Sequence, residues 1–355
     1  MSEEQYYDQA VQTLKKLIGI RSYSGEEDRT ADLISDILVA GGFKAERKGN
    51  NVWAFQKKMK PGKPLILLNS HHDTVKAGSS WTKDPFTALE EGGKLFGLGS
   101  NDAGAPLICL LMTFLRLTQT IQEYNLCFLA SAEEETSGKN GVPVVLDELG
   151  EIDLAIVGEP TSMDMAIAER GLLVLDCTAK GVSGHAARNE GENAIYKALK
   201  DIEWFRNYEF GKKSPVLGGV NMTVTMIEAG RQHNVVPDSC TFVVDVRPND
   251  QYSNEEVLGI IRDQTESEIM PRSTNLNASG INPEHPVVMK AKSLGMRIYG
   301  SQTMSDQVHM PFPSVKIGPG DTRRSHTADE FVYLEEIGQG LKGYFELLNG
   351  LKIDG

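Results

Sequence analysis

The 355-residue chain has few cysteines, and their spacing suggests no pairing. Cysteine occurs only four times, and no CxxC pair is present. The four lie singly in apolar or strand-like runs, at Cys109, Cys127, Cys177 and Cys240. Isolated cysteines of this kind favour reduced, buried thiols over a disulfide framework. We therefore expect a cytoplasmic protein.

Long apolar runs and an excess of basic residues are also missing. No run of about 18 apolar residues occurs, so no segment is expected to cross a membrane. The N-terminus, MSEEQYYDQ, is acidic and lacks the apolar core of a secretion signal. The 36 basic and 49 acidic residues give a net charge of -13, which argues against the basic stripe of a nucleic-acid-binding protein. We expect neither a membrane nor a nucleic acid as partner.

Strand and helix patterns alternate through the first 170 residues. Residues 5–19 predict an amphipathic helix, and a second helix is expected from an N-cap at Ser24 to a stop at Gly41-Gly42. The segments that follow are strands 51–56, 64–70, 124–131 and 153–160, and helices 107–118 and 141–149. Apolar strands that alternate with helices predict an α/β fold with a mostly parallel central sheet flanked by helices.

The pattern changes near residue 171, where a strand, a helix, two strands and a helix follow one another. These segments are residues 171–181, 193–208, 221–230, 240–248 and 253–264. They form most of a βαββαβ unit, which indicates a smaller α+β domain inserted into the first. The chain is also long for a single core. We expect a larger discontinuous domain, residues 1–171 and 283–355, and an inserted domain, residues 172–282.

Polar side chains that can bind metal ions follow the predicted strands and turns of the larger domain. They are His71, His72 and Asp73 after strand 64–70, Asp102 in a glycine-rich turn, Glu133, Glu134 and Glu135 after strand 124–131, Glu159 after strand 153–158, and His326 after a GPGD turn. The carboxyl ends of parallel strands meet at one crevice, where ligands bind. Histidines and carboxylates together suit Zn²⁺, Co²⁺ or Mn²⁺. Because side chains alternate along a strand, His71 and Asp73 share one face and His72 points to the other.

These residues lie in segments that resemble the M20 metallopeptidases and deacylases. In chain order the segments are SHHDTV (70–75), WTKDPF (81–86), LFGLGSNDAG (95–104), SAEEETSG (131–138), VGEPTS (157–162), ERG (169–171), GVSGHAAR (181–188), NVVPDSC (234–240), DVRP (245–248) and GPGDTRRSHTADE (318–330). The resemblance covers essentially the whole chain. It implies a zinc-exopeptidase-like catalytic domain and an inserted, ferredoxin-like domain that acts as a lid and forms a homodimer.

The same resemblance implies a set of metal ligands. His71 and Glu159 would hold one ion, His326 and Glu135 would hold the other, and Asp102 would bridge the two. One or two Zn²⁺ ions are expected, with Co²⁺ or Mn²⁺ as alternatives.

Two further carboxylates receive roles from the resemblance. Glu134 would be the general base, which takes a proton from metal-activated water and later delivers it to the leaving amine. Asp73 would hold the outer ring nitrogen of His71 and orient the ring, while His72 would be structural. The family also has a cis peptide after the bridging aspartate, so we expect one at Asp102–Ala103.

The inserted domain is expected to contribute to the active site. In the resemblance, His185 reaches the active site of a neighbouring subunit and stabilises the oxyanion. Asn234 and Arg247 match positions that hold the substrate, and an arginine fork suits an α-carboxylate. His309 has no role in this scheme, and a place in the wall of the substrate pocket is one alternative for it.

One segment departs from the family pattern, and other features bear on the substrate. The bridging motif GRGSxDMKGG reads GLGSNDAGAP at residues 97–106, without its Arg and Lys.

VGEPTS and the short length resemble the acetylornithine and acetyl-lysine deacetylase branch. We therefore predict a zinc-dependent hydrolase of linear amides that removes an acyl group, most simply acetyl, from an amino acid such as N-acetylornithine, as in arginine biosynthesis. The alternatives are N-acetylcitrulline, N-acetyl-lysine or N-succinyl amino acid substrates, a dipeptidase or carboxypeptidase, and a metal-deficient binding or scaffold protein.

Overall fold

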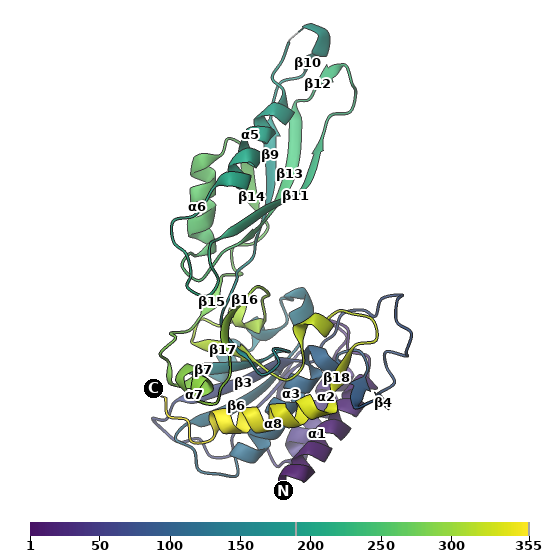
Figure 1. Cartoon of the computed structure of the whole chain (residues 1–355), viewed down its shortest axis with the longest axis vertical. Coiled ribbons are helices and arrows are strands. Elements are labelled where there is room, and N and C mark those ends of the chain that lie inside the picture. The colour runs from purple at the N-terminus through teal and green to yellow at the C-terminus, as the bar shows by residue number, and fades with distance from the viewer. Residues whose placement is uncertain (189, 354–355) are drawn as a thin grey trace. The chain divides into compact units, whose positions relative to one another are not determined.

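The chain divides into two compact units. The structure, a computed structural model, describes residues 1–188 and 190–353. The first unit comprises residues 1–167, 280–299 and 305–355, and the second comprises residues 168–279 and 300–304 (Figure 1). We expected boundaries after residues 171 and 282; the units differ from that division by a few residues and by the segment 300–304.

The central sheet has nine strands among the described residues. In spatial order they are β1 (Glu46–Lys48), β2 (Asn51–Phe55), β6 (Asn125–Ser131), β3 (Leu65–His71), β7 (Leu154–Gly158), β17 (Ser314–Ile317), β8 (Met165–Glu169) and β15 (Ser279–Gly280), and β16 (Ile298–Ser301) pairs with β8. Strands β6, β3, β7 and β17 run parallel to one another. These four are buried along their whole length, which accounts for their largely apolar sequences. The predicted α/β fold with parallel central strands is confirmed.

Helices cover the sheet of the first unit. They are α1 (Glu3–Ile18), α2 (Asp28–Ala40), α3 (Ala105–Leu117), α7 (Pro286–Ser293) and α8 (Leu334–Leu348) (Figure 1). Helix α3 packs on β3 and β6 and also contacts α1 and α8. Leu65 and Leu67 of β3 pack with Val142 and Val145 on one face of the sheet. Since side chains alternate, Ile66 and Leu68 point to the face that α3 covers.

Two local predictions in this unit are wrong. The N-cap of α2 is Glu27 rather than Ser24. The Ser24 hydroxyl instead donates a hydrogen bond of 2.7 Å to Oδ2 of Asp73, so a buried carboxylate competes for it. The expected helix at 141–149 is a 3₁₀ turn, η3 (Val142–Val144), followed by one turn of helix, α4 (Leu146–Leu149). A proline within a run of β-branched valines disfavours a continuous helix there.

The second unit contains a four-stranded antiparallel sheet covered by two helices. The spatial order is β11 (Asn221–Ala229), β13 (Ser239–Arg247), β9 (Leu173–Lys180) and β14 (Glu268–Pro271), and the helices are α5 (Ala194–Asn207) and α6 (Asn254–Gln264). Alternate residues of β9 are buried, and they form a core with both helices. The chain order is strand, helix, two strands, helix and strand, which is the predicted βαββαβ arrangement.

Several short elements were not predicted from the sequence. They are β8, β16, a two-stranded ladder of β10 (Gly184–His185) and β12 (Val235–Val236), and a three-stranded sheet of β4 (Leu89–Glu91), β5 (Lys94–Phe96) and β18 (Phe331–Tyr333). Strands of two to five residues give too few alternations for a periodic signal. No helix in the described part of the chain is both long and apolar enough to span a bilayer.

Candidate metal centre

The carboxyl ends of parallel strands bring the candidate ligands together. His71 is the last residue of β3, and its register partner in β6 is Ser131. The chain leaves β6 into a 3₁₀ turn, η2 (Glu134–Thr136), while Glu159 follows directly after β7. Because β6 and β7 flank β3, these side chains rise from three adjacent strands at one edge of the sheet.

Two irregular segments complete the cluster. Asp102 lies in η1 (Ser100–Gly104), and the expected cis peptide between Asp102 and Ala103 is present. His326 follows the 3₁₀ turn η6 (Thr322–Arg324) and has a left-handed backbone, with φ of 58°. Glu133, at the start of η2, is also left-handed, with φ of 55°. Left-handed backbone conformations cost free energy in residues with a side chain, and they concentrate at functional sites.

Asp102 faces both histidines. Its Oδ1 lies 3.2 Å from Nε2 of His71, and its Oδ2 lies 3.7 Å from Nε2 of His326. Glu159 Oε1 is 3.7 Å from the same His71 nitrogen, and Glu135 Oε2 is 2.8 Å from the His326 nitrogen. The arrangement has the form of two neighbouring nitrogen and oxygen donor sets that share one carboxylate.

The donor set fits divalent cations. His71, Glu134 and Glu159 offer donor atoms within 4.8 Å of one another, and so do His71, Asp102 and Glu135. Burial, together with neighbouring carboxylates such as Glu159, raises the pKa of Glu134 well above its ordinary value, although His71 opposes the shift. Bound cations would offset this crowding of negative charge. Imidazole and carboxylate donors suit zinc, cobalt and manganese.

Asp73 connects the two halves of the cluster. Its Oδ1 lies 3.3 Å from Nδ1 of His71, and its own carbonyl oxygen lies 3.0 Å from that nitrogen. Both contacts are acceptors, so Nδ1 carries a hydrogen, and Nε2 is the ring nitrogen that faces Asp102 and Glu159. The Asp73 carboxylate also accepts the backbone N–H groups of Glu134 and Glu135, each at 3.1 Å. Burial opposes ionisation, but the contact with His71 outweighs it and lowers the pKa of Asp73 to about 2.

His72 points away from the cluster, as the alternation of side chains predicted. Its Nε2 lies 2.9 Å from the carbonyl oxygen of Asn50, and its Nδ1 lies 2.8 Å from the hydroxyl of Thr30. Burial lowers the pKa of His72 to about 4, so the ring is neutral at physiological pH. Its contacts are those of a structural residue.

His326 pairs with the carboxylate of Glu135. The hydrogen bond to Glu135 raises the pKa of His326 to about 9, although partial burial opposes the shift. The side chain is 55% exposed, far more than that of His71 at 1%. One histidine is therefore enclosed by the sheet, and the other lies at the open side of the cluster.

Sequence reasoning missed two buried acids near the cluster. Asp306, in the 3₁₀ turn η5 (Asp306–His309), accepts a hydrogen bond from the Ser131 hydroxyl, and burial raises its pKa to about 6. Glu330 accepts backbone hydrogen bonds from the turn that carries Asp102. Burial, and then the charge of Asp102, raises the pKa of Glu330 to about 8, while the three N–H donors oppose the shift. Each acid stands alone in a polar loop, without a motif of its own. Only Glu330 lies in a segment that resembles the family, HTADE.

The three candidate residues of the inserted domain lie in the second unit. His185 is exposed on β10, and its Nδ1 accepts the N–H of Ala187 at 3.2 Å. Asn234 precedes β12, whose residue Val235 pairs with His185. Arg247 binds Asp245 through two hydrogen bonds, of 2.7 and 3.0 Å. Their roles in substrate binding stay predictions. His309, in η5, is half-buried, and burial lowers its pKa.

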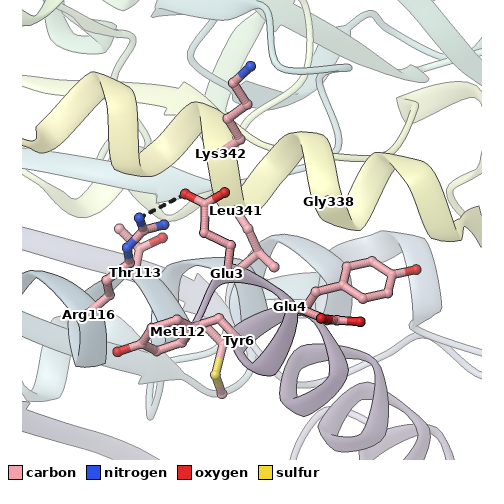
Figure 2. A pocket seen from close by; sticks show the side chains of 10 residues that line it. Glu3, Glu4, Tyr6, Met112, Thr113, Arg116, Gly338, Leu341 and Lys342 are labelled. Carbon is pink, nitrogen blue, oxygen red and sulfur yellow. Dashed lines mark hydrogen bonds and ion pairs between the residues drawn. The ribbon is translucent and has the colours of Figure 1, made fainter. Parts of the chain in front are cut away.

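A separate pocket lies among α1, α3 and α8. Its volume is about 250 Å³, and Glu3, Tyr6, Met112, Arg116 and Leu341 are among the residues that line it (Figure 2). Arg116 is paired with Glu3 at 2.9 Å. The pocket contains none of the predicted site residues, so we assign no chemistry to it.

Comparisons with known proteins place the chain in a family. The family model "Peptidase family M20/M25/M40" matches residues 67–350. The succinyl-diaminopimelate desuccinylase of Rickettsia canadensis is 30% identical over 268 residues, which cover 69% of this chain and 70% of the relative. The LysW-lysine/LysW-ornithine hydrolase of Sulfurisphaera tokodaii is 26% identical over 351 residues, which cover 95% and 94%.

A solved structure shows the same fold. The Bacillus subtilis YXEP protein, described as a dinuclear metal-binding peptidase of the M20 family, superposes with a TM-score of 0.73 at 15% identity, covering 97% of this chain and 98% of that one. The family match extends over most of the chain and includes every candidate ligand. The chain therefore belongs to peptidase family M20/M25/M40, as the resemblance implied.

Proposed function

We propose that the protein is a metal-dependent amidohydrolase that removes an N-acyl group from an amino acid with a second amino group. The observation that carries this proposal is the position of Asp102, whose two oxygens face His71 and His326. His71 and Glu159 would complete one ion site, and His326 and Glu135 would complete the other. When bound, divalent ions of the zinc type supply Lewis-acid activation of water and of the amide carbonyl.

Glu134 is the residue best placed to move the proton. Glu135 contacts His326, whereas Glu134 has a carboxylate oxygen within 4.8 Å of donor atoms of His71 and Glu159. A carboxylate in this position can act as a general base, which takes a proton from the attacking water and delivers it to the amine nitrogen as the amide C–N bond breaks. Asp73 orients His71 and holds the backbone of both glutamates.

The relatives suggest the class of amino acid. Their names refer to diaminopimelate, lysine and ornithine, each of which carries two amino groups. N-acetylornithine and N-acetyl-lysine belong to the same chemical class. We therefore favour acyl derivatives of diamino acids, with acetyl and succinyl as the groups to compare, over derivatives of amino acids with uncharged side chains such as N-acetylcitrulline.

The decisive experiment is a substrate panel on zinc-loaded and chelator-treated protein. It contains N-acetylornithine, N-acetyl-lysine, N-acetylcitrulline, N-succinyl-diaminopimelate and dipeptides that end in lysine or ornithine. We expect release of the free diamino acid from at least one acylated member, and only in the presence of metal. Equal turnover after chelation would contradict metal dependence, and cleavage of dipeptides alone would show a peptidase.

A further inference from the structure

Glu330 is a buried carboxylate that binds the backbone of the turn carrying Asp102. Its side chain is only 2% exposed. Its Oε1 accepts the N–H groups of Asn101 at 2.8 Å and Asp102 at 2.9 Å, and its Oε2 accepts the N–H of Gly99 at 3.0 Å. Three backbone donors thus converge on one side chain. A replacement that cannot accept all three leaves a buried N–H group unpaired.

The turn that Glu330 binds is irregular. Within η1, Asp102 has φ of -119° and ψ of 101°, and Ala103 has φ of -115° and ψ of 35°, so neither is helical. Gly99, just before the turn, has φ of 74°. Asp102 is therefore not held by a regular helix, and the hydrogen bonds from this turn to Glu330 contribute to its position.

Asn101 connects the same turn to the segment that leads to His326. Its Oδ1 accepts the N–H of Asp321 at 2.9 Å, and its Nδ2 donates to the carbonyl oxygen of Asp321 at 3.1 Å. Asn101 is fully buried. Glu330 lies four positions after His326, so this segment is attached to the turn both before and after the histidine.

We propose that Glu330 is a positioning residue for the metal centre, which fixes Asp102 between His71 and His326 by binding three backbone amides. This inference rests on the proposed function in one respect, the binding of ions by Asp102. In the observed orientation of the turn, Asp102 faces both histidines, and its oxygens lie 3.2 and 3.7 Å from the two Nε2 atoms. Loosening the turn moves at least one oxygen out of reach.

The test is the metal affinity of Glu330→Gln. The amide has the shape of the carboxylate, but its NH₂ group faces a backbone N–H and cannot accept from it. Titration of metal-free protein with Zn²⁺ or Co²⁺, followed by calorimetry, should show affinity about 10- to 100-fold below wild type, the usual effect of losing a group that orients a ligand. Wild-type affinity and stoichiometry in the variant would overturn the inference.

A second variant separates the position of the carboxyl group from its chemical nature and serves if Glu330→Gln does not fold. Glu330→Asp keeps the carboxyl group but withdraws it by one methylene, so it cannot reach all three amides. We expect its affinity for Zn²⁺ or Co²⁺ to lie between that of wild type and that of a variant in which residue 330 binds none of the three amides. Full wild-type affinity in Glu330→Asp would overturn the positioning role.

Asp201→Asn is the matched control. Asp201 is also a buried carboxylate that accepts two backbone N–H groups, from Glu266 at 3.1 Å and Ser267 at 2.8 Å, but it lies in the second unit. This variant should lower the melting temperature and leave metal affinity unchanged. An equal loss of affinity in Asp201→Asn would overturn the inference, because the effect would be general destabilisation. Failure of wild-type protein to bind any divalent ion would overturn the proposed function as well.

Discussion

Asp73 is the residue on which most of the site geometry depends. It contacts the ring of His71 and accepts the N–H groups of Glu134 and Glu135, and Ser24 donates to it in turn. One carboxylate therefore sets the tautomer of a candidate ligand and the path of the chain that carries the candidate base.

Replacing Glu134 should separate chemistry from metal binding. In Glu134→Gln the side chain keeps its shape but cannot take a proton, so turnover should fall by about 10²- to 10⁴-fold. The metal content should stay at the wild-type value, as measured by atomic emission. Glu133→Gln is the control, because Glu133 binds Asn140 and should affect turnover little. Loss of bound metal in Glu134→Gln would mean that Glu134 is a ligand.

Replacing Asp73 should weaken metal binding. Asp73→Asn puts an NH₂ group in the place of an oxygen that accepts from His71, Glu134 or Glu135, and a loss of about 10- to 100-fold in Zn²⁺ affinity is expected. Asp153→Asn is a matched control. Asp73 follows the carboxyl end of β3, whereas Asp153 binds the first residue of β3, since its Oδ2 accepts the N–H of Leu65 at 2.7 Å. The prediction fails if both variants bind zinc equally well in a competition assay with a chromogenic chelator.

At the scale of elements, β3, β6 and β7 place candidate ligands and also form the core. Leu67 of β3 is fully buried among Leu65, Val142 and other apolar residues. The strand that carries His71 at its end is thus fixed by packing along its length. Rigid strands of this kind suit a site in which small displacements matter.

Truncation of Leu67 should show how much this strand depends on packing. Leu67→Ala leaves a cavity in the sheet face, and the free energy of unfolding should fall by about 2–5 kcal/mol. The control Leu199→Ala removes the same atoms from a side chain that is 49% exposed on α5, and a change within about 0.5 kcal/mol is expected. Urea denaturation of both variants measures the difference. Equal losses would contradict a packed core around β3.

The elements that were predictable are those with long apolar or amphipathic patterns. Strands β3, β6 and β7 read as apolar runs, and α1 reads as an amphipathic helix, although its capping box at Ser2 and Gln5 was not predicted. Ser24 looked like an N-cap because nothing in the local sequence shows that Asp73, 49 positions away, takes its hydroxyl. Asp306 and Glu330 were missed for the same reason. Their importance lies in partners that only the folded chain brings close.

At the scale of the whole molecule, every candidate ligand belongs to the first unit. His185, Asn234 and Arg247 belong to the second unit. Metal binding should therefore act on the stability of one unit, and the second unit would contribute through the substrate or through assembly. These two contributions can be measured separately.

Removal of metal should destabilise the first unit. Ions that bind only the folded state add about 2.7 kcal/mol at a free concentration of 100 times the dissociation constant. Calorimetric scans with zinc and with chelator should show that the transition of the first unit moves to lower temperature without metal. The unfolding transition of the second unit should occur at the same temperature with and without metal. Identical scans would contradict the proposed metal centre.

Strand β11 should form a subunit contact. It lies at the edge of its sheet, and Met226 and Ile227 on it are 64% and 55% exposed. An edge strand with exposed apolar residues is suited to pairing with a second copy. Ile227→Lys should raise the dimer dissociation constant by about tenfold or more in sedimentation experiments, since a charge would be buried. Ile121→Lys, exposed in the first unit, should have no such effect, and a monomeric wild type would refute the contact.

The order of the candidate ligands along the chain has a consequence for biosynthesis. His71, Asp102, Glu135 and Glu159 precede the second unit, whereas His326 and Glu330 follow it. Once the second unit has emerged from the ribosome, the nascent chain carries four of the candidate ligands, but neither the second histidine nor the carboxylate that binds the Asp102 turn. We therefore expect a full pair of ions to bind only after the segment with His326 and Glu330 has emerged as well.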